Sequence, residues 1–210
     1  MLYTHKKITQ IALLAVLLIQ SLAVHAASVL PLGLERLVGG ADIVFHGRCL
    51  ANQVELDAST NMVVTYTTFE VLDTVKGEPG ITHTIKQIGG NLPGSNVHMK
   101  WPGVPKFIEG EEYVVFLPPQ SVAGFSSPVG LGQGNFKVLP GSQGQDVSNG
   151  RDFEELLKNI PTGSVPASVM TRMTQKFSTH SANTPQGAAS RARMGLNDFM
   201  ATLRSIGPTQ

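Results

Sequence analysis

Alternating apolar and polar residues run through the chain from residue 37 to residue 139, and the clearest case is 62–90. The first arm of this stretch, Val63–Val71, is rich in β-branched and aromatic residues, which favour a strand because they lose χ1 freedom in a helix. In the second arm isoleucines and a histidine alternate with threonines and a lysine, the period of a sheet with one wet face. Two glycines and a proline in Lys76–Gly80 predict a turn between the arms. We therefore predict a β-hairpin.

Further strands are predicted on both sides of this hairpin. Ala41–Leu50 alternates in the same way, with Ile43, Phe45 and Cys49 on its apolar face. Tyr113–Leu117 is an unbroken apolar run, which is typical of a strand covered on both faces. Residues 133–139 predict the last strand of the series. Several strands joined by short turns, with no helices between them, indicate a mainly β fold built as a small antiparallel barrel or sandwich.

The C-terminal third has a different pattern. Asp152 can cap a short helix over 152–160, which Pro161 ends. Residues 161–184 are rich in Ser, Thr, Ala and Pro, and we predict a flexible linker there. A C-terminal amphipathic helix is predicted over 185–206, and its apolar stripe must be covered by the barrel, by a second copy or by another partner. The stripe consists of Ala192, Leu196, Phe199, Leu203 and Ile206.

The first 26 residues predict an export signal. A basic start with Lys6 and Lys7 precedes an apolar run over 11–19, and Val24–Ala26 has the small residues that a signal peptidase recognises. The alternative is a membrane anchor, but the run is shorter than the roughly 18–20 apolar residues that span a bilayer. We expect cleavage after Ala26. The barrel domain would then begin at residue 27 and end at 160, and the protein would be periplasmic or extracellular.

Composition supports a folded domain and argues against nucleic acid as the partner. Hydrophobic residues make up 41% of the chain and charged residues 15%, and 22 Gly and 13 Pro suit many short turns. Residues 27–160 hold 9 Lys and Arg against 14 Asp and Glu, a net charge of −5. Residues 161–210 hold 5 against 1, a net charge of +4. A polyanion is therefore an unfavourable ligand for the barrel domain.

No motif in the sequence predicts catalysis. The single cysteine, Cys49, lies on an apolar strand face, so we predict a buried thiol and no intrachain disulfide. His46, His83 and His98 have no close metal-ligand spacing, and no G-x-S-x-G is present. We therefore predict no catalytic residue, no metal and no cofactor. The alternative is a metal-dependent or hydrolytic periplasmic enzyme that uses these histidines.

The best candidate for a binding site is the loop 89–106, in which Gly and Pro recur too often for regular structure. It contains His98, Lys100 and the only tryptophan, Trp101. Tryptophan and basic side chains often anchor contacts with partners, so we predict these three residues as binding residues. The alternative is that Trp101 folds inward as a lid on one end of the barrel.

The strand motifs resemble those of a family of bacterial exported proteins. The resemblance rests on 41–47, on 66–72 with 76–77, on 107 with 110–117, and on 132–136. Members of that family have a small barrel similar to the OB-like domain of tissue inhibitors of metalloproteinases and netrin modules, which implies an OB-like barrel over about residues 37–140. The inhibitors act through an N-terminal cysteine. The predicted mature chain begins at Ala27, with no cysteine near it, so the resemblance extends to the barrel alone.

The function that these patterns favour is an exported, non-enzymatic binding module. Its expected ligand is a protein or a component of the cell envelope, because the barrel domain is acidic. Besides the enzyme alternative, the stripe on the last helix leaves a third hypothesis open. In that case the protein is a structural subunit that pairs through this helix, and the sequence does not decide its oligomeric state.

Overall fold

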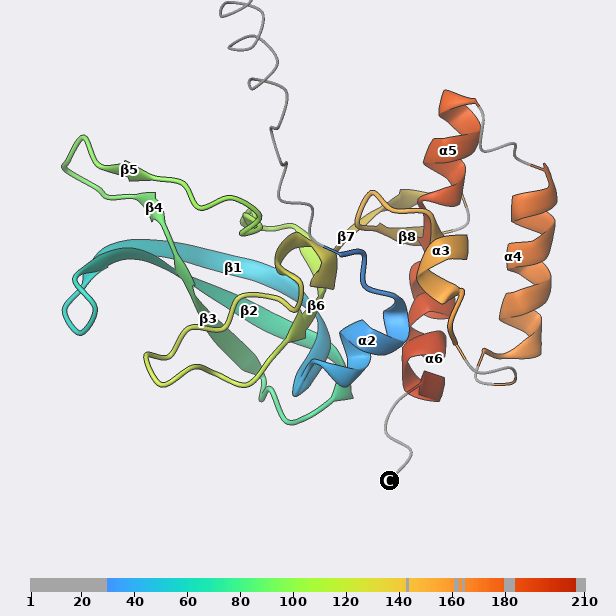
Figure 1. Cartoon of the computed structure of the whole chain (residues 1–210), viewed down its shortest axis with the longest axis horizontal. Helices are drawn as coiled ribbons and strands as arrows, with labels where there is room; N and C mark the ends of the chain where they lie inside the picture. The colour runs from blue at the N-terminus through green and yellow to red at the C-terminus, as the bar shows by residue number, and fades with distance from the viewer. Residues whose placement is uncertain (1–29, 143, 161–162, 164, 180–183, 207–210) are drawn as a thin grey trace, which may run out of the picture. The chain divides into compact units, whose positions relative to one another are not determined.

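A computed structural model describes residues 30–142, 144–160, 163, 165–179 and 184–206 (Figure 1). The predicted export signal lies outside the described residues. Residues from Pro31 onward form one compact unit. This unit is mainly β, with one sheet of seven antiparallel strands, a separate pair of short strands and several short helices. The predicted fold class is thus confirmed. No helix in the described part of the chain is both long and apolar enough to cross a bilayer.

The predicted hairpin forms one end of the sheet, with β3 as the edge strand. β2 (Met62–Lys76) pairs with β3 (Thr82–Ile88) along one edge and with β1 (Ile43–Asp57) along the other. β1 is longer than predicted, because register shifts let the chain bend and continue past Cys49. One shift lies between Cys49 and Ala51, so Asn52 returns to the face that Cys49 occupies, and its Nδ2 lies 3.6 Å from the Cys49 Sγ.

The full strand order of the sheet is β3-β2-β1-β6-β7-β8-β9. The sheet continues beyond β1 with β6 (Glu112–Leu117), β7 (Asn135–Gly141), β8 (Gly144–Ser148) and β9 (Met194–Gly195). A 3₁₀ turn, η2 (Leu131–Gly134), precedes β7. At the β3 edge the sheet meets the chain after β6 through one parallel bridge, Lys86 to Phe125. The structure thus has an antiparallel sheet with a bridged edge where the sequence predicted a small barrel.

β6 pairs with only the first part of β1, over Ile43–Arg48. Beyond that point the turn before β6 takes over the free edge of β1. The Cys49 amide donates to the Glu111 carbonyl at 2.9 Å, and the Gly110 amide donates to the Cys49 carbonyl at 2.8 Å. The Asn52 amide donates to the Glu109 carboxylate at 2.8 Å. The edge of β1 is therefore covered by a turn where the neighbouring strand ends.

Two apolar clusters lie on opposite faces of β6, as its unbroken apolar run predicted. We name the first the sheet cluster; its buried members are Phe45, Cys49, Phe69, Ile85, Phe107, Tyr113, Val115 and Leu117. The second, the helix cluster, lies where helices cover the sheet. Its largest buried side chains are Leu34, Leu37, Phe116, Phe136, Phe153, Leu156, Phe199 and Leu203. Cys49 is fully buried, so the buried thiol predicted from the sequence is confirmed, and burial raises the pKa of this thiol.

Helices α2 (Leu34–Gly39), α3 (Phe153–Leu157) and α6 (Leu196–Ile206) build the other wall of the helix cluster. Asp152 caps α3 as predicted, by accepting a hydrogen bond from the Glu154 amide. The stripe on α6 is covered by the protein's own sheet, since Phe199 packs at 4.7 Å from the Phe136 ring and α6 contacts β8 (Figure 1). The sequence left three partners open for this stripe, namely the barrel, a second copy or another protein. The structure shows that the protein's own sheet covers it.

Two predictions in the C-terminal third are wrong. The linker predicted over 161–184 contains a helix, α4 (Ala167–Thr179), which Val169 and Met173 fix to the helix cluster. This helix has too few apolar residues for its sequence pattern to reveal it. The helix predicted over 185–206 is divided into α5 (Pro185–Arg191) and α6. It breaks because Met194 and Gly195 pair with Val147 and Asp146 of β8, forming β9.

The prediction that one face of the hairpin is exposed to solvent is also partly wrong. Thr82 and Thr84 are exposed, but Lys86 is 8% exposed, because the chain around Phe125 covers it. Its Nζ lies 3.0 Å from a carboxylate oxygen of Asp57 and donates to the Ala123 carbonyl at 3.0 Å. Hydrogen bonds from Thr60, Ser59 and Lys86 hold the pKa of Asp57 well below its usual range. This buried pair joins the tip of the β1–β2 turn to β3 and to the loop after β6.

Candidate ligand-binding pocket

The sheet face that carries the sheet cluster changes from apolar to polar along its strands. On β2, Phe69 is followed on the same face by Thr67 and Thr65, and on β3 Ile85 is followed by Gln87. These residues are cross-strand neighbours, because Thr67 pairs with Ile85 and Thr65 with Gln87. The residues of β1 that face them are Asn52 and Val54. Beyond the apolar core, the sheet therefore presents a floor of hydroxyl and amide groups.

Two glycines carry the chain from β3 across this polar floor. Gly89 and Gly90 both have positive φ angles, 95° and 139°, which favour glycine. A Cβ on Gly90 would lie 2.6 Å from the Val54 side chain and 2.7 Å from the Thr65 hydroxyl. The same hydroxyl donates to the Gly89 carbonyl at 2.6 Å. The glycine pair thus permits a close approach to β1 and β2 that other residues would prevent.

After this crossing the chain forms the pair β4 (Gly90–Asn91) and β5 (His98–Met99), then returns as the irregular segment 100–107. A pocket of about 570 Å³ lies between this returning segment and the polar floor. Such a volume is in the range of small-molecule sites, roughly 300–1,000 Å³. Gln87 and Thr67 line it from the floor, and Lys100, Trp101 and Lys106 line it from the loop.

Three polar side chains of the floor are satisfied within the protein. The Asn52 Oδ1 accepts a hydrogen bond from the Thr67 hydroxyl at 2.7 Å, and its Nδ2 donates to the Phe107 carbonyl at 3.0 Å. The Thr65 hydroxyl donates to Gly89, as described above. Gln87 differs from them. It is 3% exposed, and its Nε2 has no hydrogen-bond partner among the described residues. A buried donor of this kind is rare, because leaving it unpaired costs about 1–3 kcal/mol.

The pocket is cationic although its domain is acidic. Lys100 and Lys106 are both exposed at its rim, and no acidic side chain is among the described residues that line it. Neither lysine has an ion-pair partner in the described part of the chain. Trp101 is 55% exposed, so its indole lies at the surface and does not form the buried lid considered from the sequence.

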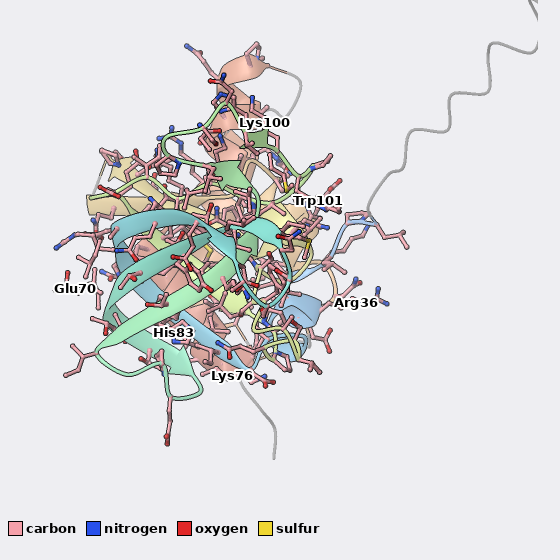
Figure 2. All side chains as sticks on the ribbon, turned by 90° about the vertical axis from the view of Figure 1, so that its left-hand side faces the viewer. Arg36, Glu70, Lys76, His83, Lys100 and Trp101 are labelled. Atoms are coloured by element: carbon pink, nitrogen blue, oxygen red, sulfur yellow. The ribbon has the colours of Figure 1, made fainter. Side chains whose placement is uncertain are left out.

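Of the three binding residues predicted from the sequence, the structure brings two into the pocket. Lys100 and Trp101 line it, whereas His98 is exposed on β5 opposite Asn91 and is not among its lining residues. Figure 2 shows Lys100 and Trp101 well away from His83 and Lys76. Gln87 and Thr67 were not predicted from the sequence. The alternation places both on the same strand face as Ile85 and Phe69, but it does not show that the chain covers them.

The three histidines considered for an enzyme lie apart. His83 packs against the Phe45 ring at 5.6 Å on the sheet-cluster side, whereas the His46 Nε2 lies 3.0 Å from Glu112 on the opposite face. His46 and His83 thus lie on opposite faces of the sheet. In the described parts of the chain, no three His, Cys, Asp or Glu residues lie close enough to hold a metal ion.

Glu112 is the centre of an ionic cluster on the face opposite the pocket. Its carboxylate accepts a hydrogen bond from Arg48 at 2.7 Å and lies 3.0 Å from His46, and Arg48 also contacts Glu70 at 3.2 Å. Burial raises the pKa of Glu112, but the hydrogen bonds from Arg48 and His46 outweigh burial and hold this pKa below its usual range. A lowered pKa means that the folded protein favours the ionised carboxylate.

This cluster predicts a pH dependence of stability. Because the pKa of Glu112 is lower in the folded state, its contribution is present above the usual glutamate pKa, about 4.3, and is lost as the pH falls through the folded value. Glu112→Gln should therefore cost about 1–2 kcal/mol at pH 7, where charged hydrogen bonds become neutral ones, and less at pH 3. Urea unfolding at both pH values measures this, with the exposed Glu55→Gln as control. An equal loss at both pH values would contradict the assignment.

Comparisons with protein families, with curated proteins and with solved structures find no match to this chain.

Proposed function

We propose that this protein is a non-enzymatic binding protein that acts outside the cytoplasm and holds a protein or cell-envelope ligand at the pocket beneath Trp101. The observation that carries the proposal is the buried Gln87 amide, which has no partner among the described residues and lines a pocket with an exposed tryptophan at its rim. A fold retains an unpaired buried donor at a cost in stability, and such costs are concentrated at functional sites.

Two further features support a binding role. Trp101 belongs to the residue types that contribute most at binding sites, and Lys100 adds a positive charge beside it; both are exposed and line the pocket. The floor beneath them is held by internal hydrogen bonds and needs little rearrangement to accept a ligand. Export rests on the signal pattern in residues 1–26, and the OB-like character rests on the resemblance given above.

The test uses Trp101 as its own reporter, because it is the only tryptophan in the chain. Fractions of a solubilised cell envelope are added to the protein lacking residues 1–26, and the tryptophan emission is recorded. We expect one fraction to shift the emission to shorter wavelength and to be retained on the immobilised protein. Trp101→Ala should reduce retention about tenfold or more, the equivalent of about 1.4 kcal/mol.

Val122→Ala is the matched control, since Val122 is fully exposed on a loop outside the pocket. Its retention of the active fraction should equal that of the unaltered protein. The retained ligand is then recovered and its mass compared with that of the starting material. An unchanged mass agrees with binding without turnover, whereas a changed mass would refute the non-enzymatic part of the proposal. Equal retention by Trp101→Ala and Val122→Ala would refute the site.

A further inference from the structure

We infer that the pocket receives an anionic group attached to a flat apolar body, such as a carboxylate next to an aromatic ring. This inference rests on the proposed function and specifies the chemistry of the ligand. Three properties of the pocket lead to it: an unpaired donor on the floor, two cations on the rim and an apolar wall beside them.

The floor requires a hydrogen-bond acceptor. The Nε2 of an amide can only donate, and that of Gln87 is buried with no partner among the described residues. Its neighbours on the floor do not supply an acceptor, because the nearest amide oxygen, that of Asn52, accepts from Thr67, and no hydroxyl of the floor lies within hydrogen-bond reach of the Gln87 Nε2. Because the Nε2 is covered, a ligand oxygen meets it only after the Gln87 amide turns toward the pocket, and the bond then satisfies a group that the fold leaves unsatisfied.

The rim selects the charge of that acceptor. Lys100 and Lys106 both line the pocket, and the lining residues that the structure describes include no carboxylate to neutralise them. The remainder of residues 27–160 is strongly acidic, with a net charge of −5 for the whole range. The two lysines favour an anion at this site, and the acidic remainder of the domain disfavours anions elsewhere on the surface. A hydrogen bond to an ionised acceptor is also stronger than one to a neutral acceptor.

The wall requires an apolar body on the ligand. Trp101, Met99, Val104 and Phe107 all line the pocket, and at about 570 Å³ it is much larger than a carboxylate or a phosphate alone. The half-exposed indole of Trp101 offers a flat surface for a ring. An inorganic anion would leave this wall in contact with water. The combination thus favours an organic anion with an aromatic or similarly flat group.

The test compares two probes that share one body and differ in charge. The anionic probe is 8-anilinonaphthalene-1-sulfonate, and the neutral probe is N-phenyl-1-naphthylamine, which lacks the sulfonate. Both accept excitation energy from tryptophan, so binding near Trp101 is read directly from its quenching. We expect the anionic probe to bind about tenfold more tightly or more, because charged hydrogen bonds form only with the sulfonate.

Variants then assign the preference to named residues. Lys100→Gln/Lys106→Gln should remove most of the preference for the anionic probe and leave the neutral probe's affinity unchanged. Arg36→Gln/Lys158→Gln is the matched control, because it removes two positive charges from exposed positions outside the pocket. Gln87→Met should also weaken the anionic probe. It should raise the melting temperature at the same time, because an unpaired buried amide is replaced by an apolar group of similar size.

A third pair of ligands distinguishes the source of the anion. N-acetylphenylalanine has the free carboxylate of a chain terminus, and its amide has the same body without the charge. Displacement of the anionic probe by the acid alone would assign the pocket to the carboxyl end of a polypeptide. Failure of both, with the probe still bound, would assign it to a free organic anion.

The inference is overturned if the two naphthalene probes bind equally, or if the pocket lysine pair changes anion binding no more than the control pair. Should Gln87→Met fail to fold, the lysine pair still decides the question. Loss of this inference leaves the proposed function intact if an envelope fraction still depends on Trp101. If neither the probes nor any fraction responds to Trp101→Ala, the proposed function falls with it.

Discussion

Phe199→Ala should lower the free energy of unfolding by about 3–5 kcal/mol, the usual cost of removing a fully buried phenylalanine. Phe199 is completely buried on α6, and its ring packs against Phe116, Phe136 and Phe153 at centroid distances of 6.4, 4.7 and 5.7 Å. The lost ring would leave a cavity among three others that are held by separate elements and cannot all move in to fill it. Urea unfolding followed by circular dichroism measures the loss.

The result tests whether the C-terminal helix belongs to the core. Asn197→Ala, an exposed change on the same helix, is the control and should be within about 0.5 kcal/mol of the unaltered protein. If Phe199→Ala does not fold, Phe199→Leu keeps most of the apolar volume and should cost less. A loss below 1 kcal/mol for Phe199→Ala would mean that α6 is not packed on the sheet as described.

Phe69→Ala should have an effect of similar size, about 3–5 kcal/mol, on the other side of β6. Phe69 is fully buried in the sheet cluster, with the Phe45 and Phe107 rings at 5.6 and 4.9 Å in edge-on contact. Cys49 is its direct neighbour across β1 and β2. The cavity should therefore also expose the thiol, and the reaction of Cys49 with Ellman's reagent in the native state should become faster.

Leu72→Ala is the control for Phe69→Ala, because Leu72 is on the same strand and is partly exposed. It should change the free energy of unfolding by no more than about 1 kcal/mol, and it should leave the rate of the thiol reaction unchanged. Because Phe69 and Phe199 belong to separate clusters, the double variant should show nearly additive losses. A double loss far from the sum would mean that the two clusters are coupled through β6.

The strands that the sequence predicted are those whose signal is local. In 62–90 the β-branched residues and the turn glycines lie within one stretch, so pattern alone identifies β2 and β3. The second half of β1 was missed because the shift at Cys49 and Ala51 interrupts the alternation, and polar Asn52 then faces the core side. Helix α4 was missed because few apolar residues, Val169 and Met173 among them, fix it to the core.

Only the part of the pocket with a local sequence signal could be predicted. Trp101 and Lys100 were identified because their residue types in an irregular loop suggest contact with a partner. Gln87 could not be identified in this way. Its burial depends on Gly89 and Gly90 turning the chain back over β1 and β2, which brings segments distant in sequence together. A glutamine at the end of a strand is usually solvated, and only the tertiary fold makes it an unpaired group.

The turn that covers β1 beyond Arg48 protects the protein against aggregation. A strand edge with unpaired amides and carbonyls is a template to which a strand of another molecule can add. Here Glu111 and Gly110 occupy both backbone groups of Cys49, and Glu109 caps the Asn52 amide with a carboxylate. An incoming strand would have to displace these bonds and approach a negative charge. The turn before β6 thus protects β1 from intermolecular pairing where β6 no longer covers it.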